Sequence, residues 1–247
     1  MGLKEELLSS KPYLFNLADQ LVTHFPERQW DALFVDDTNA RLPARFLRKV
    51  LEDSSSRSLP MYFVQSGRLA RGRVPKEKYF EYMHFIAGSL PPKKLDFSKK
   101  RALVVSESAG TFETAKFLLD ITSAEFDETD FAIVASRSSA INLDTNVYIG
   151  IYGKEITRII GQTFEGAKEK SLFYFGRKIL PPSVRLKITR RFPQIVTEST
   201  QKMTGVKGSN NPYVAASRTE NSARLAHLFR SRMNLLAQEY FMRKKAS

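Results

Sequence analysis

Short apolar runs recur through the first part of the chain, and polar residues follow most of them. Runs rich in aliphatic and aromatic residues occupy positions 30–35, 59–65, 102–105, 131–136 and 146–152. Uninterrupted apolar runs of this length are typical of strands that are buried on both faces of a parallel sheet. We therefore predict a strand at each of these positions.

Apolar residues spaced three and four apart predict helices between these strands. Residues 12–25 carry such a stripe, with Pro12 suited to the first turn and Pro26 just after the end. Residues 44–51 and 112–119 show the same spacing. Because strands that alternate with helices build parallel sheets, we expect an α/β domain over residues 1–153.

Polar loops follow three of the predicted strands, at residues 36–41, 66–73 and 106–114. Ligands of open parallel sheets bind outside the carboxyl ends of the strands. We therefore expect these loops to converge on one crevice. The loop that starts at Ser106 (SESAGT) also runs into a helix, whose free N–H groups and dipole favour a bound anion.

The stretch 101–119 resembles the diphosphoribosyl-binding signature of the type I phosphoribosyltransferases. In that signature an apolar strand, an acidic pair and a Thr-Gly-Gly-Thr-like loop lead into a helix, and here Ser106-Glu107 and residues 111–114 (TFET) occupy those places. The resemblance implies a phosphoribosyltransferase-like, Rossmann-like fold, with Glu107 as the catalytic carboxylate. It also implies that phosphate and ribose contact Ser106, Ser108, Gly110, Thr111 and Thr114.

Three residues differ from the family's pattern. Ser106 replaces one carboxylate, and Phe112 and Glu113 replace the two glycines whose amides close on the phosphate. Glu113 also brings a negative charge next to that phosphate, which disfavours its binding. We therefore expect a ribose-phosphate or nucleotide-like ligand, such as phosphoribosyl diphosphate, to bind more readily than it reacts. Only an active enzyme, a glycosyltransferase, would need Mg²⁺.

Residues 36–43 (DDTNARLP) resemble the pyrophosphate-binding loop of the same family. The resemblance implies that Asp37, Asn39 and Arg41 contact pyrophosphate, since arginine pairs with phosphate oxygens in a bidentate manner. The alternative is that Arg41 pairs with Asp36 or Asp37 and only fixes the loop.

A long polar excursion spans residues 68–100, where phosphoribosyltransferases carry a flexible lid. Loops of this length inside an α/β domain are usually functional or mobile. The resemblance implies that Arg68, Arg71 and Arg73 reach an anion at the sheet edge. The alternative is that any lid-like loop would show a similar polar composition.

Positive charge is concentrated at the end of the chain. The chain has 39 Lys and Arg against 26 Asp and Glu, a net charge of +13. Residues 1–153 hold 20 of each kind, and residues 154–247 hold 19 against 6. A basic segment joined to a neutral domain predicts an anionic partner, nucleic acid above all. It is equally compatible with a basic surface that only promotes solubility.

The basic extension, residues 154–247, is expected to be mainly helical. Residues 217–245 predict a long helix whose apolar stripe packs on the body of the protein or on a second copy. Residues 184–193 (VRLKITRRFP) alternate apolar and basic residues, as a strand or a helix with a basic face would. Such interleaving suits contact with a phosphate backbone. The candidate nucleic-acid contacts are Arg185, Lys187, Arg190 and Arg191.

The composition narrows the class of protein. The chain has no cysteine and three histidines, which excludes disulfides and thiolate chemistry and disfavours a histidine metal site. It has no apolar run near the roughly 18 residues of a membrane span, and its first residues are charged, so we expect a cytoplasmic protein. Two functions stay open: a phosphoribosyltransferase-like nucleotide-binding protein, or an inactive regulator or effector of the same fold that binds nucleic acid, including within a ribonucleoprotein assembly.

Overall fold

The computed structural model describes most of the predicted domain and the last helix. The described residues are 3–36, 40–64, 75, 77–78, 81, 101–109, 113–123, 126–136, 145–153, 174–175, 178–179, 186–187, 190–193 and 220–246. Within these ranges, no helix is long and apolar enough to cross a membrane.

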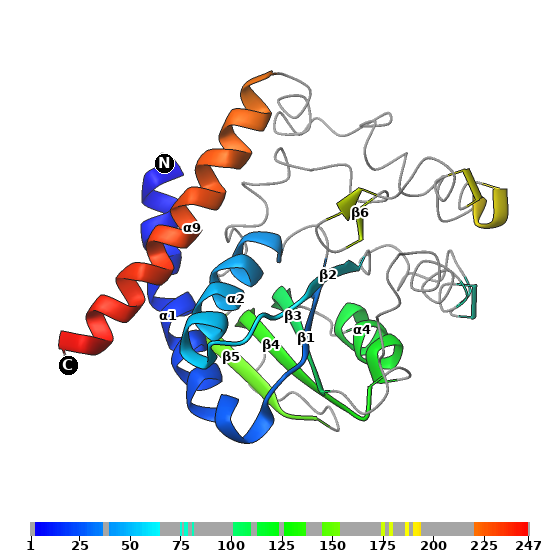
Figure 1. The fold of residues 1–247 in the computed structure, drawn as a ribbon, viewed down its shortest axis with the longest axis horizontal. Coiled ribbons are helices and arrows are strands. Elements are labelled where there is room, and N and C mark those ends of the chain that lie inside the picture. Colours follow the sequence, from blue (N-terminus) through cyan, green and yellow to red (C-terminus); the bar gives the residue numbers. More distant parts are fainter. Residues whose placement is uncertain are drawn as a thin grey trace.

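Helices and strands alternate along the chain, as the apolar runs predict (Figure 1). The order is α1 (Leu3–Arg28), β1 (Ala32–Asp36), α2 (Arg41–Ser55), β2 (Met61–Val64), β3 (Arg101–Ala109), α4 (Glu113–Ser123), β4 (Glu128–Ser136), β5 (Val147–Tyr152), β6 (Tyr174–Phe175), β7 (Lys178–Ile179) and α9 (Glu220–Ala246).

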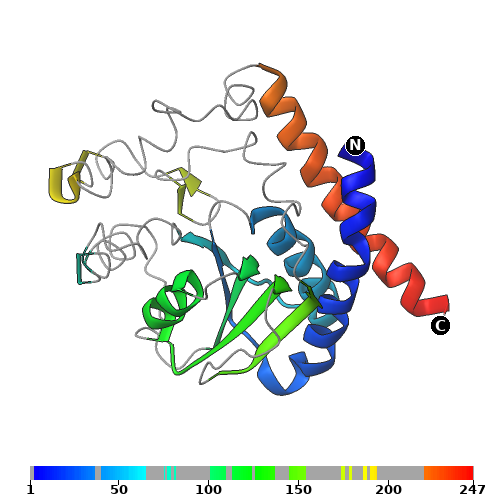
Figure 2. The same cartoon turned by 180° about the vertical axis from the view of Figure 1, so that it is seen from behind.

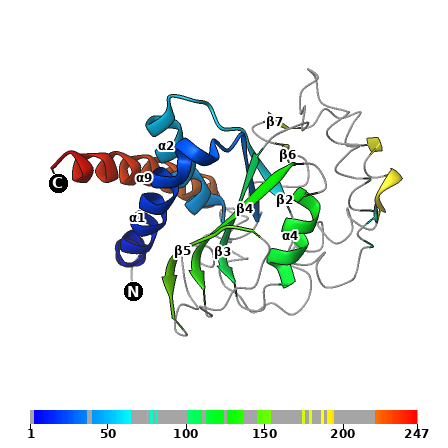
Figure 3. The same cartoon turned by 90° about the horizontal axis from the view of Figure 1, so that it is seen from below.

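The first five strands form one parallel sheet in the order β2-β1-β3-β4-β5. The register places Val35 of β1 opposite Phe63 of β2 and opposite Val105 of β3. Helices α1 and α2 cover one face of the sheet and α4 covers the other (Figure 3). The predicted α/β fold with a parallel sheet is confirmed.

Alternation along the strands fills both layers of the core, because successive side chains point to opposite faces. Leu33 and Val35 of β1 join the cluster under α1 and α2. Phe34, between them, faces the α4 side and meets the ring of Phe126 edge-on at 5.2 Å. On α1, Leu14, Leu17 and Leu21 repeat at helical spacing and are all fully buried. Each such side chain contributes about 1.5–3 kcal/mol through burial.

Helix α1 lies unusually close to the edge strand β5. A Cβ atom at Gly150 would stand 2.6 Å from the carbonyl oxygens of both Tyr13 and Val134, so only glycine fits there. The side chain of Asn16 donates to the Gly150 carbonyl at 2.7 Å. The Gln20 amide donates to the carbonyl of Ile149 at 2.8 Å and accepts from its N–H at 3.4 Å. Helix α1 therefore hydrogen-bonds to the backbone of β5.

The last helix packs against the body of the protein. Met233, Ala237 and Tyr240 of α9 are buried in the core cluster of α1 and α2. The Tyr240 ring meets those of Phe15 and Phe46 edge-on, and its hydroxyl donates to Asp19 at 2.8 Å. Figures 1 and 2 show α9 crossing α1, and the helix that α9 packs along is α2. We predicted that this helix packs on the body of the protein or on a second copy. The part of α9 whose side chains the structure describes, residues 231–246, packs on the body.

The structure differs from the predictions at the ends of α1, at the end of β3 and in an additional strand pair. Helix α1 contains both Pro12 and Pro26, so neither proline marks its ends. Strand β3 continues from Ser106 to Ala109, where we predicted a loop, because it pairs with β4 as far as Ser136. The antiparallel pair β6–β7 was not predicted, since its strands are two residues long and show no alternation.

Candidate functional site

The connections of the sheet reverse direction between β1 and β3. These strands are neighbours, yet the helix that follows β1 lies on one face and the helix that follows β3 lies on the other (Figure 3). In open α/β sheets ligands bind at the carboxyl ends of such a strand pair, because the two connections part there. The edge formed by the ends of β1 and β3 is therefore the candidate site.

The charge and capping at the start of α2, at this edge, favour an anion. Its N-cap residue, Ala40, makes no side-chain hydrogen bond, and the first turn carries no acidic residue. The first helical hydrogen bond joins the N–H of Ala44 to the carbonyl of Ala40 at 2.8 Å. The N–H groups of Arg41 and Leu42 precede this bond and have no acceptor within the helix. Together with the helix dipole they stabilise negative charge.

Helix α4 starts at the same edge but differs in charge. Its first residue is Glu113. A carboxylate in the first turn already complements the positive end of the helix dipole. An anion at this edge is therefore better placed against α2 than against α4.

The structure places Ser106 inside β3, opposite Ile133 of β4. Ser106 is only 4% exposed and stands three residues before the end of the strand at Ala109. It is thus a buried strand residue and does not lie in a loop. Glu107 and Ser108 continue the same strand towards the candidate edge, and their side chains lie outside the described part of the structure.

The other predicted ligand contacts are described in part or not at all. Arg41 is the first residue of α2, and Thr114 lies in the first turn of α4, with the backbone alone described at each. Both alternatives for Arg41 therefore stay open. Outside the described residues lie Asp37, Asn39, Gly110, Thr111, Arg68, Arg71 and Arg73.

Of the candidate nucleic-acid contacts, Lys187, Arg190 and Arg191 are exposed, and Arg185 lies outside the described residues. The backbone at residues 186–187, 190–191 and 193 is helical, which favours the helix over the strand for this segment. Arg191 pairs with Glu81 at 2.9 Å. Hydrogen bonds from Lys78 and from Arg191 lower the pKa of Glu81.

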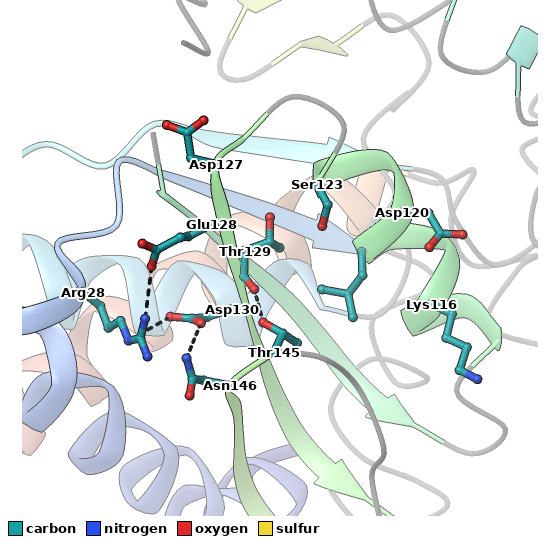
Figure 4. Close-up of a pocket in the computed structure, with 11 residues that line it drawn as sticks. Arg28, Lys116, Asp120, Ser123, Asp127, Glu128, Thr129, Asp130, Thr145 and Asn146 are labelled. Atoms are coloured by element: carbon teal, nitrogen blue, oxygen red, sulfur yellow. Dashed lines mark hydrogen bonds and ion pairs between the residues drawn. The ribbon is translucent and has the colours of Figure 1, made fainter. Parts of the chain in front are cut away.

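The opposite edge of the sheet, where the strands begin, holds a network of charged groups that the sequence did not reveal (Figure 4). Asp130 is 4% exposed and accepts hydrogen bonds from Trp30 Nε1 and Asn146 Nδ2, both at 2.9 Å. Arg28 lies 3.6 Å from Asp130 and 3.1 Å from Glu128. Burial alone would lower the pKa of Arg28, but Asp130, Tyr148 and Glu128 together outweigh burial and raise it.

Arg101 joins the same network to the end of α1. Its guanidinium donates to the carbonyls of Glu27 and Arg28, at 2.7 and 3.2 Å, and to Glu128 at 2.9 Å. A cation that bonds the last carbonyls of a helix satisfies unpaired acceptors and complements the dipole. We call Arg28, Arg101, Glu128 and Asp130, with Trp30 and Asn146, the amino-edge network.

No protein-family model and no curated protein matches the sequence. Among solved structures, a hypothetical protein from Neisseria gonorrhoeae with bound ppGpp is 19% identical with a TM-score of 0.40, over 59% of this chain and 80% of that one. A glutamic acid mutant from an analysis of an invariant aspartic acid in HPRTs is 10% identical with a TM-score of 0.42, over 59% and 78%. The alanine mutant from that analysis is 11% identical with a TM-score of 0.42, over 60% and 78%. Likeness at this level does not establish a family.

Proposed function

We propose that this protein binds a ribose-phosphate or nucleotide-like anion at the carboxyl ends of β1 and β3. The observation that carries the proposal is the start of α2, which lies at the reversal point of the sheet, has no side-chain cap from Ala40 and has no acidic residue in its first turn. An anion there gains both hydrogen bonds and the favourable end of the helix dipole.

Several of the predicted residues have a role in this proposal. Phosphate oxygens accept from the N–H groups of Arg41 and Leu42, and the Arg41 guanidinium adds a charge-assisted pair. Glu107, near the end of β3, accepts from the ribose hydroxyls. The second phosphate is held by Ser108, Gly110, Thr111 and Thr114, as the family resemblance implies.

Binding without efficient transfer fits the residues best. Glycosyl transfer needs negative groups near the developing charge at the anomeric carbon, usually together with Mg²⁺. Ser106 has no carboxylate and is buried within β3. We therefore reserve Mg²⁺ for the case that transfer is observed.

Calorimetric titration with phosphoribosyl diphosphate, with and without Mg²⁺, tests the proposal. Arg41→Gln should weaken binding roughly tenfold, because charge-assisted hydrogen bonds to phosphate are lost. Arg45→Gln, the same change one helical turn later, is the matched control and should bind as the wild type does. The absence of any binding heat from the wild type, or equal losses in both variants, would overturn the proposal.

A second candidate is nucleic-acid binding by the basic extension, as an effector or regulator. It is favoured by the exposed Lys187 and Arg190 and by the three basic residues in the last turn of α9. Each phosphate contact adds about 0.7 to 0.9 to the slope of log affinity against log salt. Lys187→Ala with Arg190→Ala should reduce that slope, whereas Lys49→Ala in α2 should not. A slope of zero for the wild type excludes this function.

A further inference from the structure

A cavity of about 670 Å³ opens at the edge of the sheet opposite to the proposed anion site. Its walls come from the second half of α4, the start of β4 and the residues before β5 (Figure 4). Leu119 and Ser123 contribute from α4, and Thr129 and Asn146 contribute from the sheet side. Cavities of this size hold small organic ligands in other proteins.

The cavity is acidic although the chain as a whole is basic. Four carboxylates line it, those of Asp120, Asp127, Glu128 and Asp130, against the cations of Arg28 and Lys116. Arg28 is already paired with Glu128 and Asp130. The carboxyl end of α4 adds the negative end of a helix dipole, and its last turn has no basic residue. The cavity therefore favours a cation.

A buried hydroxyl in the wall gives independent evidence for a ligand. Thr129 is 8% exposed, and its Oγ1 has no hydrogen-bond partner among the residues that the structure describes. The backbone carbonyl of the same residue, by contrast, accepts from the Thr145 hydroxyl. Buried polar side chains nearly always have a partner, and each exception calls for an explanation.

We propose that this cavity binds a small polyamine. Ammonium groups pair with Asp120 and Asp127, the lining carboxylates outside the amino-edge network. The methylene chain packs on Leu119, and the Thr129 hydroxyl turns towards an N–H group of the ligand and accepts from it. A bare metal ion fits less well, since the described acidic residues do not gather in a group of three or more that could hold one. The apolar wall likewise has no role for a metal.

Calorimetric titration of the full chain with spermidine in about 0.15 M salt tests the proposal, because screening at this ionic strength suppresses weak surface binding. Asp127→Asn should weaken binding roughly threefold or more through the loss of one charge pair. Asp53→Asn makes the same charge change on α2, outside the cavity, and should bind as the wild type does. Equal affinities in all three proteins, or no binding heat in the wild type, would overturn the assignment.

Thr129→Val separates a ligand contact from a purely structural hydroxyl. We expect spermidine affinity to fall roughly fivefold, as for one lost hydrogen bond. The unfolding midpoint of the ligand-free protein should not fall, since the hydroxyl that is removed has no protein partner. Unchanged affinity in this variant would contradict the hydrogen bond, and Mg²⁺ binding as strongly as spermidine would contradict the choice of an organic cation.

The cavity and the proposed anion site are independent of each other. Asp127→Asn should leave phosphoribosyl diphosphate binding unchanged, and Arg41→Gln should leave spermidine binding unchanged. Failure of either proposal therefore leaves the other standing. If one variant weakens the binding of both ligands, the assignment of the two ligands to separate sites at opposite edges is wrong.

Discussion

The two edges of the parallel sheet differ in how their polar groups are satisfied. At the amino edge, Asp130 accepts from Trp30 and Asn146, and Arg101 bonds the last carbonyls of α1. At the carboxyl edge, α2 starts without a side-chain cap and without an acidic residue in its first turn. The charged groups of the amino edge hold helices and strands together, whereas the start of α2 at the carboxyl edge has N–H groups that suit a ligand.

This difference follows from the cost of burying charge. A carboxylate as buried as Asp130 is tolerated only when it is paired and hydrogen-bonded, and such groups link elements that are distant in the chain. Trp30 and Asp130 are 100 residues apart. A ligand-binding group requires the opposite arrangement, because a group that is already paired cannot bond a ligand.

The largest expected effect comes from breaking the amino-edge network at its centre. Asp130→Ala should lower the free energy of unfolding by about 3–5 kcal/mol, because Trp30 Nε1 and Arg28 lose a buried partner. Urea unfolding measures this change. Asp127→Asn, at an exposed acidic residue three positions earlier in the chain, should shift stability by less than about 0.5 kcal/mol. Similar effects in the two variants would contradict the special role of Asp130.

Near the carboxyl edge, close packing should matter more than charge. Gly150→Ala should cost about 2–3 kcal/mol, because the added methyl group meets the carbonyl oxygens of Tyr13 and Val134 at 2.6 Å. Chemical unfolding at low and high salt distinguishes the two edges. The loss in this variant should be independent of salt, and a salt-dependent loss would contradict a steric cause.

Removal of the Arg101 guanidinium, which bonds the last carbonyls of α1, tests the same difference between the two edges. Arg101→Gln should cost about 1–2 kcal/mol, because bonds to two helix carbonyls and to Glu128 are lost. Part of that loss should disappear at 1 M salt, since the group is partly exposed and its charge is screened. Lys49→Gln, which breaks an exposed pair with Asp53 on α2, is the matched control and should change stability little.

A smaller effect is expected where α9 contacts α1, away from both edges. Burial, followed by the hydrogen bond to Asp19, raises the pKa of Tyr240 above its usual range. The folded state therefore holds this proton more tightly, so its contribution is complete below pH 10, the pKa of an unfolded tyrosine, and is lost as the pH rises further. Unfolding measured at pH 8 and pH 10.5 should show this decrease.

Tyr240→Phe should cost about 1 kcal/mol at neutral pH and should reduce that alkaline loss. Burial also raises the pKa of Tyr148, so a part of the slope should remain in the variant. An alkaline slope identical to that of the wild type would contradict the contribution of Tyr240.

The sequence predicted the strands well, because each apolar run is long enough to be buried on both faces. It failed at Ser106 and its two polar successors, where pairing of β3 with β4 outweighs the polarity of the side chains. It also missed the amino-edge network and the acidic cavity. Their residues come from α1, α4, β3, β4 and the approach to β5, and no local pattern connects positions so far apart.

The candidate site was likewise predicted only in part. The apolar strand before Ser106 indicated which part of the sheet would face a ligand, and the sheet order places β1 and β3 side by side as that prediction requires. The open start of α2 was not predicted, because the missing cap at Ala40 is a property of the backbone conformation there.

The amide of Gln20 has a consequence for self-association. It offers Ile149 the same donor and acceptor that a neighbouring strand would offer. A second copy, or any extended peptide, cannot add to the sheet beside this residue without first displacing that side chain. One glutamine thereby discourages the growth of ordered aggregates along β5, a hazard that exposed sheet edges otherwise present.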